Sequence, residues 1–339
     1  MTRGALLVQV RTMPPVAAAT AGAVCISSSA VLMRLAATSA SITALGRCAF
    51  ALPVLGALAL LERRRGAPPM PSRSRWLARL AGVFLAADLI LWSHAINAIG
   101  AGLGTVVTNL QVLIISLLAW LILGERPRRS LVLASPVMLA GLALVGGLAE
   151  VGGTHAYGTD PRLGVVYGIG VAILYAIYIL MLRQATSSPG ARTAVAASLF
   201  EATAGATVGS AVLGFALHDF QLGPAWPTLG WLALLALTSQ VVGWLLITVS
   251  MPQLPAAMIG ALLLVQPAGS VALSYLILDE RPSVLQLAGV ALVLTGVLVA
   301  VGGRATKTPG PEPAYVRRRT RIMRHASAAS TGKSESKSP

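Results

Sequence analysis

QVLIISLLAWLILGERP at 111–127 and QPAGSVALSYLILDERP at 266–282 are the two stretches that decide the expected fold. Sliding the chain by 155 residues aligns them without a gap, and 11 of the 37 positions between 111–147 and 266–302 are identical. Leucine-rich segments resemble one another by chance, but a Glu-Arg-Pro shared at the same offset does not follow from apolar composition. The sequence therefore contains an internal repeat.

The residues around these stretches are apolar enough to need lipid as their solvent. The chain of 339 residues is 55% hydrophobic and 11% charged, with a mean hydropathy of +0.76, whereas soluble domains carry about 25% charged residues. Runs long enough to cross a hydrocarbon core of about 30 Å recur along the chain. They predict ten helices, at 16–33, 41–61, 77–98, 103–123, 131–148, 163–182, 194–217, 228–250, 256–278 and 284–302.

The spacing of the repeat determines how its two copies should face the membrane. A shift of 155 residues spans five helices, and because five is odd the second copy must cross the membrane in the opposite direction. Inverted repeats are typical of secondary transporters. We therefore expect an all-α integral membrane protein with ten transmembrane helices in two inverted five-helix repeats. Its expected parts are an N-terminus at 1–15, a first repeat at 16–148, an external linker at 149–162, a second repeat at 163–303 and a basic, disordered tail at 304–339.

The net charge of +15 lies in loops and in the tail. Nine of the 26 basic residues follow position 303, and few aromatic residues lie among them, so an RNA-binding tail is not favoured. With both termini in the cytoplasm, 22 of the 26 basic residues lie on the cytoplasmic side, as the positive-inside rule requires. We expect a multi-pass protein of the plasma (inner) membrane, its tail near anionic lipid, with no nucleic-acid partner.

Sequence motifs for catalysis or cofactor binding are not found. The two cysteines, Cys25 and Cys48, lie in apolar runs and predict neither a disulfide nor a metal site. No HExxH motif or phosphate-binding Gly-Lys loop is present. A membrane-embedded enzyme would need a convergent set of acid, base or metal groups, so the sequence favours no enzyme, no metal and no cofactor.

Three ionisable residues are expected inside spans, where each is a candidate functional group. They are Arg47, Asp88 and Glu201. Arg47 and Glu201 differ in depth by about 9 Å and are not expected to pair. Arg47 could bind an anionic group or be a structural arginine that reaches the interface. Asp88, near the midplane, could carry a proton, or could form an ion pair with Arg47 that keeps it structural.

Aromatic and polar residues in neighbouring spans complete the candidate site. Tyr175 and Tyr178 lie with Tyr167 on one helical face, which could line a cavity or could pack and anchor the helix at the interface. Gly205-x-x-x-Gly209 predicts a close helix contact. The other candidates are Trp92, His94, Asn97, Gln111, Gln240, Trp244, Gln266 and Pro267, the last of which could free a carbonyl in mid-helix or simply kink the helix.

The endings LILGERP and LILDERP resemble the EamA-type transporters of the drug/metabolite transporter superfamily. The resemblance covers residues 16–302. In that family a proline precedes the glutamate by thirteen residues in both halves, which Pro267 and Glu280 match, whereas the first half has Val112. The resemblance implies a central cavity and export of small metabolites such as amino acids. It leaves open whether transport is proton-coupled or a passive facilitation.

Overall fold

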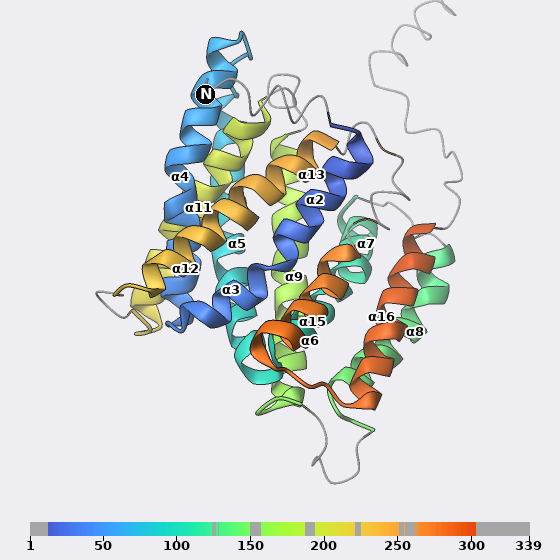
Figure 1. Ribbon diagram of the computed structural model, residues 1–339. Coiled ribbons are helices and arrows are strands. Elements are labelled where there is room, and N and C mark those ends of the chain that lie inside the picture. The colour runs from blue at the N-terminus through green and yellow to red at the C-terminus, as the bar shows by residue number, and fades with distance from the viewer. Residues whose placement is uncertain are drawn as a thin grey trace, which may run out of the picture. The chain divides into compact units, whose positions relative to one another are not determined.

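The computed structural model describes residues 13–123, 127, 129–149, 157–186, 194–220, 225–250, 254, 262 and 264–302, and its regular structure there is entirely helical (Figure 1). Glu125 and the basic tail, both singled out in the sequence, lie outside these residues. The helices are α2 (Pro15–Ser27), α3 (Ser29–Ala36), α4 (Ala40–Arg64), α5 (Ser72–Ile99), α6 (Ala101–Val107), α7 (Gln111–Leu123), α8 (Arg129–Val145), α9 (Pro161–Ala185), α11 (Val195–Ala216), α12 (Thr228–Leu235), α13 (Trp244–Ser250), α15 (Val265–Leu278) and α16 (Val284–Gly302).

Within the described part of the chain, seven helical segments are long and apolar enough to cross a membrane. They are Pro15–Ala36, Ala40–Arg64, Ser72–Ile99, Ala101–Leu118, Pro161–Ala185, Val195–Ala216 and Thr228–Ile247. Three shorter apolar helices, Arg129–Val145, Val265–Leu278 and Val284–Ala300, complete the set among the described residues. Each overlaps one of the segments predicted from sequence, and the chain is a multi-pass membrane protein.

Three of the expected helices are interrupted rather than continuous. α2 and α3 break at Ser28, whose hydroxyl donates to the Cys25 carbonyl (2.7 Å). A 3₁₀ turn at Thr108–Leu110 separates α6 from α7, and the Asn109 amide donates to the Thr105 carbonyl there (3.0 Å). A π-helix at Ala236–Gly243 separates α12 from α13. Short polar side chains compete for backbone carbonyls in this way, which apolar periodicity does not reveal.

The sequence repeat is visible as helices that begin 155 residues apart. α4 and α11 begin at Ala40 and Val195, and α8 and α16 begin at Arg129 and Val284. Equivalent helices pack antiparallel. The Ser130 hydroxyl at the start of α8 donates to the Ala300 carbonyl near the end of α16 (3.2 Å). This antiparallel pairing is the arrangement that an inverted two-repeat layout requires.

Carboxylates at helix ends join equivalent helices of the two halves. At one end of the α4–α11 pair, the backbone N–H of Ala196 donates to Glu62 (2.9 Å), and at the other end the N–H of Ser41 donates to Asp219 (3.0 Å). Each carboxylate thus accepts from the otherwise unpaired N–H groups at the start of the partner helix. The favourable interaction of an anion with a helix N-terminus strengthens both contacts.

Glu280, from the repeated Glu-Arg-Pro, makes the same contact between α15 and α6. The N–H groups of Ala101 and Gly102 donate to its two carboxylate oxygens (2.8 and 3.1 Å). Glu280 follows the end of α15, and its side chain is buried, at 1% exposure, because it caps α6.

Small residues allow α5 and α11 to cross closely. Gly205 faces the backbone carbonyl of Arg79, and Gly209 faces Val83 and Ala86 on α5. A Cβ atom at either glycine would crowd α5, so the close helix contact predicted from the Gly-x-x-x-Gly spacing is confirmed. The crossing brings the buried faces of α5 and α11 together in one hydrophobic cluster.

Candidate functional site

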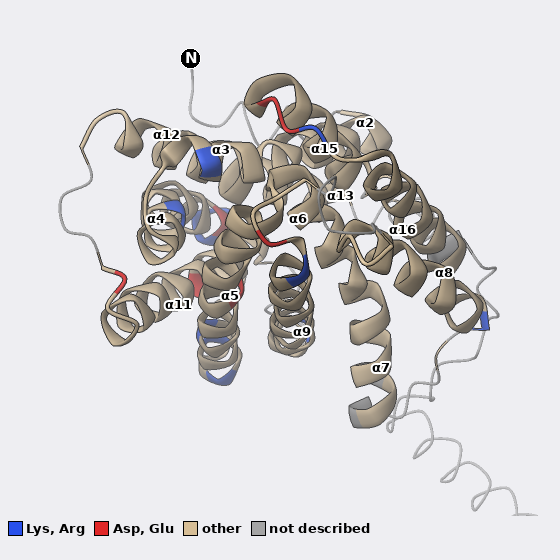
Figure 2. Cartoon of the chain, turned by 90° about the horizontal axis from the view of Figure 1, so that it is seen from below, with Lys and Arg blue, Asp and Glu red and all other residues tan. Residues whose placement is uncertain are grey.

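Five polar side chains from α4, α5, α11 and the π-helix meet in the interior of the helical bundle. We call Arg47, Asp88, Trp92, Thr203 and Gln240 the central cluster, and each is at most 7% exposed. Figure 2 shows how few charged residues lie within these helices, which are tan over most of their length. Charged groups buried among apolar helices are costly and mark functional sites in membrane proteins.

Direct contacts connect four members of the central cluster. The Arg47 Nε donates to the Gln240 Oε1 (3.0 Å), and the Gln240 Nε2 donates to the Thr203 hydroxyl (3.3 Å). The guanidinium carbon of Arg47 lies 5.9 Å from the centroid of the Trp92 ring, within cation–π range. These contacts orient the guanidinium from one side, and its Nη1 atom makes no hydrogen bond to the described residues.

Local helix geometry explains why these side chains converge. Asp88 and Trp92 are four residues apart on α5, so they project from the same face of the helix. Gln240 lies within the π-helix, where the wider turn displaces side chains from their α-helical register. π-Helical turns inside α-helices occur frequently at functional sites. The irregular segment therefore presents Gln240 to Arg47.

Three atoms of the central cluster are fully buried without a hydrogen-bond partner among the residues that the structure describes. They are the Arg47 Nη1, the Asp88 Oδ1 and the Trp92 Nε1. Buried polar atoms nearly always have partners, because an unpaired donor or acceptor costs about 1–3 kcal/mol. The cluster thus offers two donors and one acceptor, on a guanidinium, an indole and a carboxyl group, to a bound group.

The ion pair between Arg47 and Asp88 that the sequence left open is not formed among the described residues. Arg47 donates to Gln240 instead. Tyr178 from α9 lies in the same buried cluster as Trp92, and Tyr175 packs against that cluster. Their rings are 5.7 Å apart between centroids, so the two tyrosines border the central cluster.

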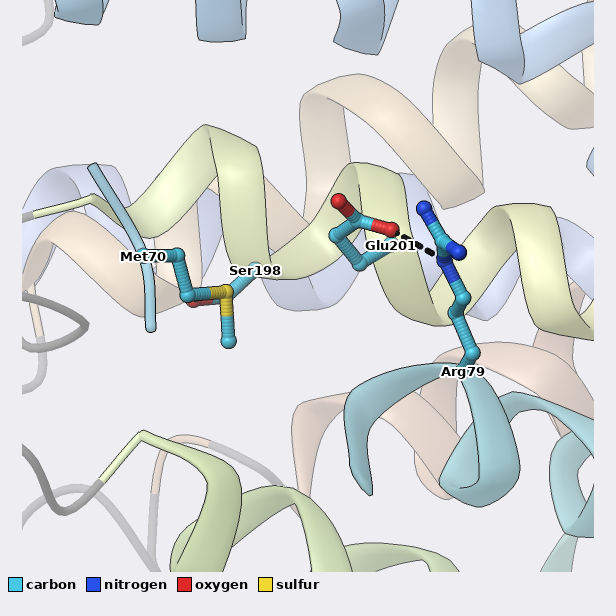
Figure 3. A network of polar contacts seen from close by, with 4 residues as sticks. All are labelled: Met70, Arg79, Ser198 and Glu201. Carbon is cyan, nitrogen blue, oxygen red and sulfur yellow. Dashed lines mark hydrogen bonds and ion pairs between the residues drawn. The ribbon is translucent and has the colours of Figure 1, made fainter. Parts of the chain in front are cut away.

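Glu201 is bound elsewhere, by a partner on α5. Its Oε2 accepts from the Arg79 Nε (2.6 Å), as Figure 3 shows. The Arg79 guanidinium also lies 5.2 Å from the centroid of the Trp76 ring. Glu201 and Arg47 therefore do not pair, as expected from their depths, and Arg79 is the partner of Glu201.

Two of the remaining candidates, His94 and Asn97, have partners outside the central cluster. The His94 ring contacts the Tyr167 ring, with centroids 5.6 Å apart, and the exposed Asn97 accepts from the Arg34 Nη1 (3.1 Å). Gln111 begins α7, and Trp244 begins α13; both are partly exposed.

Gln266 and Pro267 are in the first turn of α15. Pro267 thus occupies a position where its missing N–H costs little, and not the expected mid-helix position.

Sequence reasoning missed Thr203 and the π-helix, which hold Gln240 in place. A lone threonine in an apolar span gives no signal of its own, since its hydroxyl can also bond its own helix. Of the residues described here, no group of three or more His, Cys, Asp or Glu side chains could hold a metal ion.

Comparison with known proteins connects this arrangement to a family. A family model for EamA-like transporters matches residues 13–147 and 162–302. No curated protein matches the chain. Twenty-seven chains of solved structures match this chain. One of them, a crystal structure, has a TM-score of 0.58 and 19% sequence identity, and the match covers 87% of this chain and 99% of the chain in that structure. That likeness concerns the fold alone. Because the family model matches both repeats, the chain belongs to the EamA-like transporter family.

Proposed function

We propose that this protein is a ten-span secondary transporter of the plasma membrane, with both termini in the cytoplasm, that exports small amphipathic zwitterions such as amino acids. Membership of a transporter family supports transport, and the distribution of basic residues supports the orientation. The observation that carries the substrate class is the set of unpartnered buried atoms on Arg47, Asp88 and Trp92.

The chemistry of those atoms matches the two ends of an amino acid. The Arg47 Nη1 and the Trp92 Nε1 are donors, and a carboxylate is the preferred acceptor for a guanidinium. The Asp88 Oδ1 is an acceptor for an ammonium group. Tyr175 and Tyr178 border the same place with apolar ring faces. A zwitterion with an apolar side chain would satisfy all three atoms without adding net charge to the membrane interior.

Alternating access follows from the two halves of the protein. Equivalent helices pair antiparallel, and the central cluster takes Arg47, Asp88 and Trp92 from the first half and Thr203 and Gln240 from the second. A movement of one half against the other would expose the cluster to either side in turn. A proton and the substrate ammonium would compete for Asp88, so inward proton movement would drive export.

Efflux from proteoliposomes tests this function. We would load vesicles with radiolabelled L-leucine, with 3-methylbutylamine or with 4-methylpentanoate, which share an apolar body but differ in charged groups. We expect leucine to leave the vesicles fastest. When the solution outside the vesicles is acidic, we expect leucine to leave against its concentration gradient. Equal, gradient-limited loss of leucine at all pH differences would indicate a passive facilitator. No protein-dependent loss of any of the three would contradict the proposal.

A further inference from the structure

A separate pocket of about 430 Å³ opens where α4 ends and where α5 and α11 begin. Its walls are largely apolar and include Leu60 on α4, Met70 before α5 and Phe200 on α11. Met70 is 7% exposed, and the Ser198 hydroxyl on α11 lies 4.0 Å from its sulfur, which places the thioether against α11 (Figure 3). The volume is in the range of about 300–1,000 Å³ typical of small-molecule sites.

The charged groups of this pocket are arranged in two layers. Arg63 and Arg75 line it and are exposed. Glu62 also lines it, but both of its carboxylate oxygens accept backbone N–H groups of α11. Glu201 lines the pocket at 8% exposure, seven residues into α11 and therefore about 9 Å beyond its first residue. The pocket thus has cations at its mouth and a buried carboxylate at its inner end.

One oxygen of Glu201 remains available to a ligand. The Oε2 accepts from Arg79, and Figure 3 shows the other oxygen directed away from Arg79. Of the described residues, none donates to that second oxygen. A carboxylate with a free oxygen at the end of an apolar pocket suits an ammonium group, which can form short charge-assisted hydrogen bonds there.

We propose that this pocket is a loading site, distinct from the central cluster, that binds the zwitterion from the cytoplasm before transfer inward. The substrate ammonium bonds the Glu201 Oε1, its apolar body lies against Met70 and Phe200, and its carboxylate faces Arg63 and Arg75. The identity of the occupant as a zwitterion rests on the proposed function. Glu201 and Thr203 of the central cluster are two residues apart on α11, a rise of about 3 Å, but they project from different faces of the helix, so the loading site and the central cluster are separate sites at similar depth.

Protection of an introduced cysteine tests the loading site directly, using purified protein. Ala67 lines the pocket and is partly exposed, whereas Ser72 is exposed nearby without lining it. In a background with Cys25→Ser and Cys48→Ser, we would measure the rate at which a small maleimide labels Ala67→Cys or Ser72→Cys. We expect leucine and 3-methylbutylamine to slow labelling of Ala67→Cys only, and 4-methylpentanoate to protect much less.

Two matched substitutions separate ligand binding from the ion pair. Glu201→Gln and Arg79→Gln both remove the Arg79–Glu201 pair, but only the first removes the carboxylate. We expect Glu201→Gln to raise the leucine concentration for half-protection about tenfold, the effect of one lost charge-assisted contact. Arg79→Gln should leave protection intact or strengthen it. Equal losses of protection in both variants would assign Glu201 a structural role and overturn the proposal.

The two proposals fail in different ways. Efflux of leucine by a protein whose Ala67→Cys labelling is unaffected by leucine would overturn the loading site and leave the transport function standing. Protection of Ala67→Cys without protein-dependent efflux of any probe would support the site and overturn the transport function. Protection of Ser72→Cys to the same degree would show that the effect is not local to the pocket, and would overturn the loading site.

Discussion

Replacing Glu280 with alanine removes the acceptor for the backbone N–H groups of Ala101 and Gly102. Both groups are buried at the start of α6, and no water can reach a side chain that is 1% exposed without rearrangement. Each unsatisfied buried donor costs about 1–3 kcal/mol. The loss of an anion at a helix N-terminus adds about 0.3–2 kcal/mol. For two such donors and the lost anion, we therefore expect the free energy of unfolding to fall by about 2–8 kcal/mol.

The neighbouring Asp279 provides a matched control. It pairs with Arg281 (2.9 Å), and both side chains are more than 70% exposed. Asp279 has a positive φ of 51°, which asparagine tolerates. We expect Asp279→Asn to change the free energy of unfolding by less than about 0.5 kcal/mol, because exposed ion pairs contribute little. Glu280→Gln should fall between the two, since one amide oxygen can still accept.

Equilibrium unfolding of the purified protein in mixed micelles, followed by circular dichroism, measures these differences. The expected order of stability is wild type and Asp279→Asn together, then Glu280→Gln, then Glu280→Ala. A Glu280→Ala protein as stable as Asp279→Asn would refute the assignment of Glu280 as the cap that connects α15 to α6.

Three further substitutions test other parts of the account. Gly100 has φ 97° and ψ 161°, a conformation that costs other residues about 1–3 kcal/mol, and a Cβ there would lie 2.9 Å from the Glu280 Oε2. Gly100→Ala should therefore lower the free energy of unfolding by at least about 1–3 kcal/mol in the same assay. An unchanged unfolding midpoint would contradict this expectation. Asp88→Asn should abolish uphill leucine efflux while leucine exchange survives, and retained pH-driven efflux would remove Asp88 from the coupling mechanism. Pro267→Ala should change stability by less than about 1 kcal/mol, because the proline lies in the first turn of α15; a larger loss would point to a kink.

The spans and the repeat were predictable because they depend on composition and spacing. Lipid requires long apolar runs, and equivalent helices begin at the same 155-residue offset that aligns the two Glu-Arg-Pro segments. The helix contact at Gly205 and Gly209 was predictable for a similar reason, since small residues on one face allow close approach. These features are local or periodic.

The partners of the buried charges were not predictable, because they depend on the packing of distant segments. Arg47 bonds Gln240, which is 193 residues away and is presented by a π-helix. Glu201 bonds Arg79, which lies 122 residues earlier, near the start of α5. Depth along a helix excluded the pairing of Arg47 with Glu201. Depth along a helix could not identify the side chain on another helix that each of these two residues bonds.

Carboxylate discrimination by Arg47 tests the central claim most directly. In proteoliposomes, we would compare efflux of leucine with efflux of 3-methylbutylamine, which lacks the carboxylate, for the wild type and for Arg47→Gln. The account predicts that Arg47→Gln lowers leucine efflux about tenfold or more, as expected for one lost charged contact, while efflux of the amine persists and so confirms a folded protein. If Arg47→Gln still preferred leucine over the amine as strongly as the wild type does, this result would contradict the binding of a substrate carboxylate at the central cluster.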